Sequence, residues 1–195
     1  YEEISSRKQM EKYEGAFVFE PIPGMYENIS VFDFTSSYGT TIVTYNLSKS
    51  TFLGEDGKEK DAHHITLEGK EAYFSKKPGF FPEMLKEIIE KRKKYKRELQ
   101  EKPDAIKKAR SNAFKLLANA SYGYQGFFGA RYYCREAAAA TAAFAKKMIK
   151  EVIEKIDKSG YKVIYSDTDS IAFLMAGKTE PQTLEFLKKL NSQLP

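Results

Sequence analysis

The stretch that decides the fold is Val163-Ile164-Tyr165-Ser166-Asp167-Thr168-Asp169-Ser170-Ile171-Ala172-Phe173-Leu174-Met175, a β-forming run interrupted by two acids. Apolar β-formers on both sides of a short polar break predict a β-hairpin. In extended backbone, residues two apart project from the same side, so the carboxylates of Asp167 and Asp169 should lie close together. Like charges held this close repel, and a divalent cation would relieve the repulsion. The alternative is a solvated turn with incidental acids.

The types of the surrounding residues indicate which cation would bind. Hard oxygen ligands with no Cys or His nearby favour Mg²⁺ or Mn²⁺ over zinc. The single cysteine, Cys134, has no partner for a disulfide or a zinc site, so we interpret it as a buried core residue of a protein from a reducing compartment. His63 and His64 are adjacent and would point in different directions, which predicts surface residues rather than a metal pair.

Length and composition limit the class of protein. A chain of 195 residues can bury one sizeable core, or form one domain with an inserted subdomain. Charged residues make up 30% of the chain, no apolar run approaches membrane-spanning length, and the start shows no signal-peptide pattern. We therefore expect an intracellular, cytoplasmic protein with no membrane partner. The first residue is Tyr1 rather than Met, which suits a piece of a longer chain.

The positive charge is concentrated in one segment. The formal net charge is +5, and residues 86–110 contain eleven Lys or Arg against five Asp or Glu, a local charge of +6. The rest of the chain is close to neutral. Such a patch suits a polyanion, either nucleic acid or a nucleoside triphosphate. An ordinary solvated helix face is the alternative.

The first part of the chain predicts two strands. Residues 13–20 alternate after Gly15 and predict an edge strand, and residues 29–34 predict a second strand. The period of two places Asp33 on the same face as Ile29 and Val31. An acid at the end of an otherwise buried strand either caps the next turn or binds a ligand.

Residues 40–48 predict a short helix or irregular structure, and residues 49–77 predict connecting structure. Helical periodicity then predicts helices over residues 83–100 and 105–122, joined by a short connection into an antiparallel hairpin. Arg92 and Lys96 share one face of the first helix. A polar stripe is expected on the second helix, made of Lys108, Ser111, Lys115, Asn119 and Tyr122. The opposite side is expected to pack through Ala109, Ala113, Leu116, Leu117 and Ala120.

The rest of the chain returns to the acidic hairpin. Residues 123–129 contain three glycines and three aromatic residues, which predict either a surface on which bases stack or a packed aromatic turn. A long helix is expected over residues 135–157, followed by a strand over residues 161–165. A last helix is expected over residues 180–193.

Together these elements predict an α+β fold: a small antiparallel sheet holding Asp33, Asp167 and Asp169, with flanking helices and an inserted helical hairpin. Carboxylates that collect two divalent ions, beside cations that can hold phosphates, are the components of two-metal phosphoryl transfer. The sequence therefore indicates that chemistry.

Four motifs, in order, resemble the polymerase core of family B DNA polymerases, particularly the archaeal type. Asp33–Tyr38 resembles the motif Asp-Phe-x-Ser-Leu-Tyr-Pro-Ser, and Lys115–Gly123 is similar to Lys-x-x-x-Asn-Ser-x-Tyr-Gly. Tyr165–Asp169 matches Tyr-x-Asp-Thr-Asp. Tyr13–Ala16 resembles Tyr-x-Gly-Gly/Ala, which in the family joins the proofreading and polymerising parts and touches template. The resemblance covers nearly the whole chain.

The resemblance implies a palm made of residues 1–82 and 123–195, with fingers at 83–122 and with the exonuclease and thumb absent from this chain. It implies a DNA-directed DNA polymerase that adds deoxynucleotides to a primer 3′ end by two-metal nucleotidyl transfer. A thumb would come from the rest of a longer chain or from a second subunit. The alternative is a catalytically weak polymerase-like subunit that binds nucleic acid or scaffolds a replication complex.

The resemblance also implies roles for single residues. Asp33 and Asp169 would be the principal ligands of two Mg²⁺ ions, for which Mn²⁺ can substitute. Asp167 would be a third carboxylate, and the Phe34 carbonyl an extra ligand. Lys115 joins the acids in the catalytic set. The nucleotide-binding set is Ser36, Ser37, Tyr38, Arg92, Lys96, Lys115 and Asn119, and the template and primer set is Tyr13, Gly15, Tyr122, Gly123 and Thr168.

Within the nucleotide-binding set, Tyr38 would be the steric gate that excludes ribonucleotides. The first motif departs from the family's pattern because Ser37 and Gly39 replace Leu and Pro, which predicts a more flexible backbone beside Tyr38. In the second motif, Ala120 and Ser121 replace Ser and a larger residue. The implied partners are primer-template DNA, deoxynucleoside triphosphates and a thumb-containing polypeptide, with a nucleoid-associated location if the source is archaeal.

Overall fold

The computed structural model describes residues 5–7, 13–57 and 61–194. These residues form two compact units. Unit 1 comprises the described part of residues 1–14 together with residues 36–143, and unit 2 comprises residues 15–35 and 144–194. In the described ranges, no helix combines the length and the apolar character needed to cross a bilayer.

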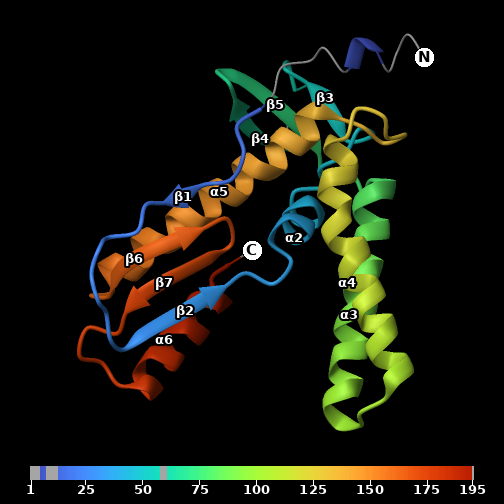
Figure 1. The fold of residues 1–195 in the computed structure, drawn as a ribbon. Coiled ribbons are helices and arrows are strands. Elements are labelled where there is room, and N and C mark those ends of the chain that lie inside the picture. Colours follow the sequence, from blue (N-terminus) through green and yellow to red (C-terminus); the bar gives the residue numbers. More distant parts are fainter. Residues whose placement is uncertain (1–4, 8–12, 58–60, 195) are drawn as a thin grey trace. The chain divides into compact units, whose positions relative to one another are not determined.

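Unit 2 is built on a four-stranded antiparallel sheet (Figure 1). Its strands are β1 (Val18–Phe19), β2 (Ile29–Asp33), β6 (Lys162–Asp167) and β7 (Ser170–Leu174), in the order β1-β6-β7-β2. The predicted acidic hairpin is therefore confirmed as β6 and β7. The predicted strand over residues 13–20 is an edge strand, but it is limited to Val18–Phe19.

One face of this sheet carries the core of unit 2. Phe173 and Ile171 of β7 are completely buried against Ile149 and Val152 of α5 (Arg135–Lys158). Helix α6 (Glu180–Ser192) adds Leu190 to the same cluster. The expectation of helices flanking the sheet is thus confirmed for this unit.

The opposite face of the sheet is open. Asp33 shares a face with Ile29 and Val31 as predicted, but that face is exposed, with 64% of Val31 accessible to solvent. The expectation that this strand is otherwise buried is wrong. The reason is that β2 lies at the edge of the sheet and buries its other side, where Phe32 and Phe34 pack on the core.

Unit 1 contains the helical hairpin, and Figure 1 shows its two helices side by side. Helix α3 spans Phe80–Glu101 and helix α4 spans Ala105–Gly126, so the predicted hairpin is confirmed. Helix α4 continues beyond its predicted end at residue 122. Gln125 explains the extension, because its buried Nε2 donates a hydrogen bond to the Leu47 carbonyl at 2.9 Å and anchors the last turn.

The packing side of α4 differs from the prediction. Leu116 and Leu117 were expected to pack, but they are 69% and 53% exposed. The buried positions are instead Ala118, Ser121 and Gln125. These buried side chains of α4 are small or polar because α2 (Ser37–Thr44) packs closely against them. Ile42 of α2 lies in the same cluster as Ala118.

Residues 49–77, expected to be connecting structure, form a second antiparallel sheet. Its strands are β3 (Phe52–Gly54), β4 (Ala62–Leu67) and β5 (Lys70–Ser75), in the order β3-β5-β4. A two-residue turn joins β4 to β5, and both of its residues, Glu68 and Gly69, have positive φ, as type I′ turns require. The prediction was wrong because β3 has only three residues and the adjacent histidines of β4 interrupt its alternation of polar and apolar residues.

Asn46 fixes the end of α2 to this second sheet. It follows the helix in the left-handed conformation that asparagine tolerates well. Its buried amide nitrogen donates to the carbonyls of Ser75 and Lys77, each at 2.6 Å, and its amide oxygen accepts from the Gly79 N–H at 3.0 Å. One side chain thus satisfies three backbone groups.

We predict that Asn46→Ala lowers the free energy of unfolding by about 3 kcal/mol. The substitution leaves the three backbone groups without partners, and alanine tolerates the positive φ at this position less well than asparagine does. The exposed Asn112 of α4 provides the control. Asn112→Ala should leave stability unchanged or slightly raised, as alanine favours helix. Urea unfolding measures both, and equal effects of the two substitutions would contradict the role of Asn46.

Candidate functional site

The acids of the open sheet face are placed by strand register. Asp33 ends β2 and Asp167 ends β6, and both are paired with Ser170, the first residue of β7. Side chains of directly paired residues project from the same face of a sheet. Asp33, Ser170 and Asp167 therefore form a row on the open face, with the outer two Cα atoms about 10 Å apart across two strand spacings.

Asp169 lies in the turn between β6 and β7. Thr168 has a positive φ of 54°, and the Asp169 N–H donates to the Asp167 carbonyl at 2.6 Å, which closes the turn. The Asp169 carbonyl accepts from the Phe34 N–H at 2.8 Å. This bond ties the turn to the residue that follows Asp33, so the two separated segments are joined through main-chain atoms.

The three carboxylates interact. Burial raises the pKa of Asp169 above its ordinary value, and the negative charges of Asp33 and Asp167 raise it further. The charges of Asp33 and Asp167 thus act on Asp169, while the binding of a metal ion by the three acids stays a prediction. Two hydroxyl groups fix Asp167: Thr168 Oγ1 donates to Oδ1 at 2.8 Å, and the Tyr165 hydroxyl donates to Oδ2 at 3.4 Å.

The contact of Tyr165 with Asp167 was missed from the sequence. Its signal was available, because residues two apart in a strand share a face and Tyr165 precedes Asp167 by two. Thr168, expected to contact template or primer, contacts Asp167 through its side chain and the Phe17 carbonyl through its N–H, at 3.0 Å.

The donor set suits a hard cation. Only oxygen donors lie in this row, and repulsion between carboxylates is what a divalent ion relieves. Within the described ranges, no group of three or more His, Cys, Asp or Glu residues is arranged to hold a metal ion. Mg²⁺ does not require such a cage, because it is commonly held by one or two carboxylates together with water and substrate phosphates. The acids therefore fit Mg²⁺ by their chemistry.

In unit 1, three pairs from the predicted nucleotide and template sets are in contact. Ser36 is the residue before α2, and its Oγ accepts a hydrogen bond from Arg92 Nη1 at 2.6 Å. The rings of Tyr38 and Tyr122 stack with centroids 4.3 Å apart. The Tyr13 hydroxyl lies 3.2 Å from that of Tyr122 and donates to it, and burial together with this bond raises the pKa of Tyr122.

Four other predicted residues of unit 1 are exposed, Gly123 among them. Lys96, Lys115 and Asn119 are accessible to solvent, and no contact described here joins them to another predicted site residue. A Cβ at Gly123 would meet no atom within 4 Å, so packing does not require glycine at this position; the same holds for Gly15 in unit 2. Both positions therefore leave backbone open to a ligand.

The two departures from the first motif lie within α2 and are buried. A Cβ at Gly39 would lie 3.4 Å from Ile89 Cδ1 and 3.7 Å from the Ala118 carbonyl oxygen. Ser37 is 6% exposed. These are ordinary van der Waals distances, so the packing of α2 against α3 and α4 does not require glycine at position 39.

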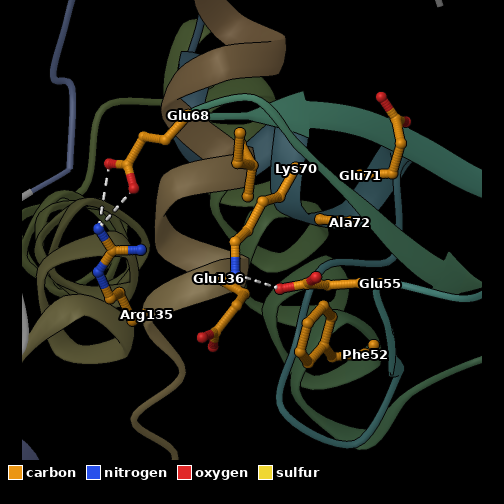
Figure 2. Close-up of a pocket in the computed structure, with 10 residues that line it drawn as sticks. Phe52, Glu55, Glu68, Lys70, Glu71, Ala72, Arg135 and Glu136 are labelled. Atoms are coloured by element: carbon orange, nitrogen blue, oxygen red, sulfur yellow. Dashed lines mark hydrogen bonds and ion pairs between the residues drawn. The ribbon is translucent and has the colours of Figure 1, made fainter.

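A cavity of about 570 Å³ lies in unit 1 between the second sheet and the start of α5 (Figure 2). Four of its charged groups form two ion pairs: Arg135 Nη2 lies 2.9 and 3.0 Å from the two carboxylate oxygens of Glu68, and Lys70 Nζ lies 3.0 Å from Glu55. None of the sequence-predicted site residues lines it. The predicted site is therefore a set of open surfaces rather than this cavity.

Comparison with known proteins identifies relatives. The profile of the family described as DNA polymerase family B matches residues 2–194. The chain is 36% identical to DNA polymerase 1 of Pyrococcus abyssi over 97% of its own length and 25% of that protein. It is 37% identical to DNA polymerase 2 of Aeropyrum pernix over 90% of its own length and 22% of that protein.

The fold agrees with a solved structure. The family B DNA polymerase from the hyperthermophilic archaeon Pyrobaculum calidifontis superimposes with a TM-score of 0.72 at 32% identity, over 95% of this chain and 25% of that one. The chain thus spans about a quarter of the length of the proteins it matches. Since the profile covers nearly every residue, the chain belongs to DNA polymerase family B.

Proposed function

We propose that this chain is the polymerising part of a DNA-directed DNA polymerase that adds deoxynucleotides to a primer 3′ end. Residues 1–82 and 123–195 would form the palm and residues 83–122 the fingers, with a thumb supplied by further polypeptide. The observation that carries the proposal is the coupling of Asp33 with Asp169 on the open sheet face. Family membership makes polymerisation the reaction that best accounts for it.

The acids would hold two Mg²⁺ or Mn²⁺ ions. Asp33 and Asp169 are the main ligands in this proposal, with the Phe34 carbonyl as an additional oxygen. Bound ions would lower the pKa of the attacking 3′-hydroxyl and neutralise charge on the triphosphate. Asp167 keeps its position through the hydroxyls of Tyr165 and Thr168 and adds negative charge that strengthens ion binding.

The open face around these acids suits the primer terminus. Ile29, Val31 and Tyr165 are exposed on the face that carries Asp33. Exposed apolar side chains beside carboxylates favour a ligand with both an apolar surface and a charge-bearing end, such as the sugar and base of a terminal nucleotide.

Unit 1 would bind the incoming nucleotide. Arg92, Lys96 and Lys115 are cations that can pair with phosphate oxygens, and Asn119 lies one helical turn from Lys115. Tyr38 stacks on Tyr122, which holds its ring in one orientation. A ring fixed in this way can exclude a 2′-hydroxyl by contact with the sugar.

We expect Asp169→Asn to reduce primer extension about a thousandfold, since losing a metal-binding carboxylate removes several kcal/mol of transition-state stabilisation. The measurement is single-turnover extension of primer-template DNA with Mg²⁺ and deoxynucleotides by the purified protein. Asp56→Asn, at an exposed position in unit 1, is the matched control and should retain activity. Undiminished extension by Asp169→Asn would refute the assignment of Asp169 as a metal ligand, whereas negligible extension by the parent protein would favour the catalytically weak polymerase-like subunit.

The raised pKa of Asp169 predicts a metal-dependent stability. The folded state binds the proton of the Asp169 carboxyl more tightly than the unfolded chain does. The stability contributed by Asp169 is therefore complete below its unfolded pKa of about 3.9 and is lost as pH rises through its folded pKa. At neutral pH without metal, Asp33→Asn should therefore raise Tm. Saturating Mg²⁺ should stabilise the parent protein by about 1 kcal/mol and the variant by less.

Thermal unfolding with EDTA and with Mg²⁺ measures both effects. Asp56→Asn should respond to Mg²⁺ as the parent does. An equal Mg²⁺ response in Asp33→Asn would show that Asp33 binds no ion.

Tyr38→Ala should increase ribonucleotide incorporation relative to deoxynucleotide incorporation by about tenfold, or 1.4 kcal/mol, because the ring that would clash with the 2′-hydroxyl is removed. Tyr38→Phe keeps the ring and should retain the sugar preference. The ratio of kcat/KM for the two sugars is the readout. A ratio unchanged in Tyr38→Ala would mean that the ring only packs against Tyr122.

A further inference from the structure

Helix α4 exposes an apolar stripe that the proposed function does not use. The stripe consists of Ile106, Ala113, Leu117 and Tyr124, which follow one another at spacings of seven, four and seven residues. At about 3.6 residues per turn, these spacings keep the four side chains within an arc of about 40° along about 27 Å of helix. Ile106 is 66% exposed, Leu117 53% and Tyr124 42%, and Ala113 is exposed as well.

The stripe is separate from the other two sides of α4. The buried positions, Ala118, Ser121 and Gln125, are centred roughly a quarter of a turn away from it and face the neighbouring helices. Lys115, a proposed contact of the nucleotide, leaves from the opposite side of the helix. Neither packing nor the proposed nucleotide site therefore accounts for an apolar stripe of this length.

The charge beside the stripe limits what can cover it. Arg110 lies one turn beyond Ile106 at the edge of the stripe, where its guanidinium packs over the Tyr95 ring and donates to the Tyr95 hydroxyl at 3.2 Å. It forms no ion pair with any acid that the structure describes. Between Ala105 and Gly126 the helix contains three further cations, Lys107, Lys108 and Lys115, and no Asp or Glu.

This charge distribution argues against two of the possible occupants. A second copy of the chain docked through the same stripe would bring two helices together that carry cations and no acid, and these would repel each other. Nucleic acid would find cations at the edge of the stripe but only apolar side chains along its centre. The surface instead fits an occupant with an apolar centre and acidic edges.

We propose that the stripe docks an amphipathic helix of a partner protein, with apolar side chains along one face of that helix and Asp or Glu on both sides of them. Amphipathic helices bind through apolar anchors spaced by three, four and seven residues, which are the spacings that this stripe offers. Acidic side chains at the edges would pair with Arg110 and give the interaction its specificity. The proposal goes beyond the proposed function and does not depend on it.

The test is the fluorescence anisotropy of a labelled helical peptide of about 20 residues, with Leu at positions i, i+4, i+7 and i+11 and Glu on both sides of this row. The purified protein should bind this peptide. Ile106→Gln/Leu117→Gln should weaken binding about tenfold, because two apolar side chains lose their contact with the peptide. The variant should keep its circular dichroism spectrum and its primer extension, because both side chains are exposed and neither belongs to the proposed site.

The matched control is Met25→Gln/Leu184→Gln, which removes two exposed apolar side chains from unit 2 and should bind the peptide as the parent does. A second peptide, with Lys in place of every Glu, tests the charge. It should bind about tenfold more weakly, and the difference between the two peptides should shrink above about 0.1 M salt, where surface charges are screened.

Four results would overturn the proposal. The first is failure of the parent to bind the acidic peptide, or equal binding of both peptides. The second is a dimer of the parent that Ile106→Gln/Leu117→Gln dissociates in sedimentation, which would make a second copy the occupant. The third is a loss of primer-template affinity in this variant, which would assign the stripe to DNA. The fourth is loss of peptide binding when the polypeptide that supplies the thumb is present, since that polypeptide would then cover the stripe.

Discussion

The hydrogen bond from the Phe34 N–H to the Asp169 carbonyl links the two segments that carry the acids of unit 2. Without this hydrogen bond, Asp33 at the end of β2 and Asp169 in the turn before β7 would be connected only through the pairing of β2 with β7. The pairing of Ser170 with both Asp33 and Asp167 extends the same constraint across the sheet. Because these are main-chain interactions, the acids are held by the fold rather than by attraction between their side chains, which repel one another.

The main-chain pairing that positions the acids depends on a sheet with one buried face and one exposed face. The buried face, with Phe173 and Ile171 packed on α5 and α6, supplies apolar burial that holds the register. A slip of one residue would turn those side chains outward and Asp33 inward. The positions of the acids and the stability of the core are therefore set by the same register, and the open face is free to carry charge.

The sequence was sufficient for the elements that have a strong local signal. The acidic hairpin, the long helices and the α+β class followed from apolar periodicity and from the break at Asp167 and Asp169. The motifs led to the family because each placed several polar residues at fixed spacing. The second sheet was missed because the adjacent residues His63 and His64 interrupt the alternation of polar and apolar residues in β4, and because a strand depends on packing against its neighbours. The exposure of Leu116 and Leu117 could not be predicted either, since it depends on which side of α4 the helices α2 and α3 cover.

The two units concentrate opposite charges. Unit 2 gathers carboxylates on an open sheet face, and unit 1 exposes lysines such as Lys96 and Lys115 on its helical hairpin. Each arrangement lowers stability on its own, because like charges repel. Divalent cations would relieve the repulsion among the carboxylates of unit 2, and phosphate groups would relieve the repulsion among the lysines of unit 1. In this interpretation each unit stores repulsion that binding removes, so part of the binding free energy comes from strain already present in the unliganded fold.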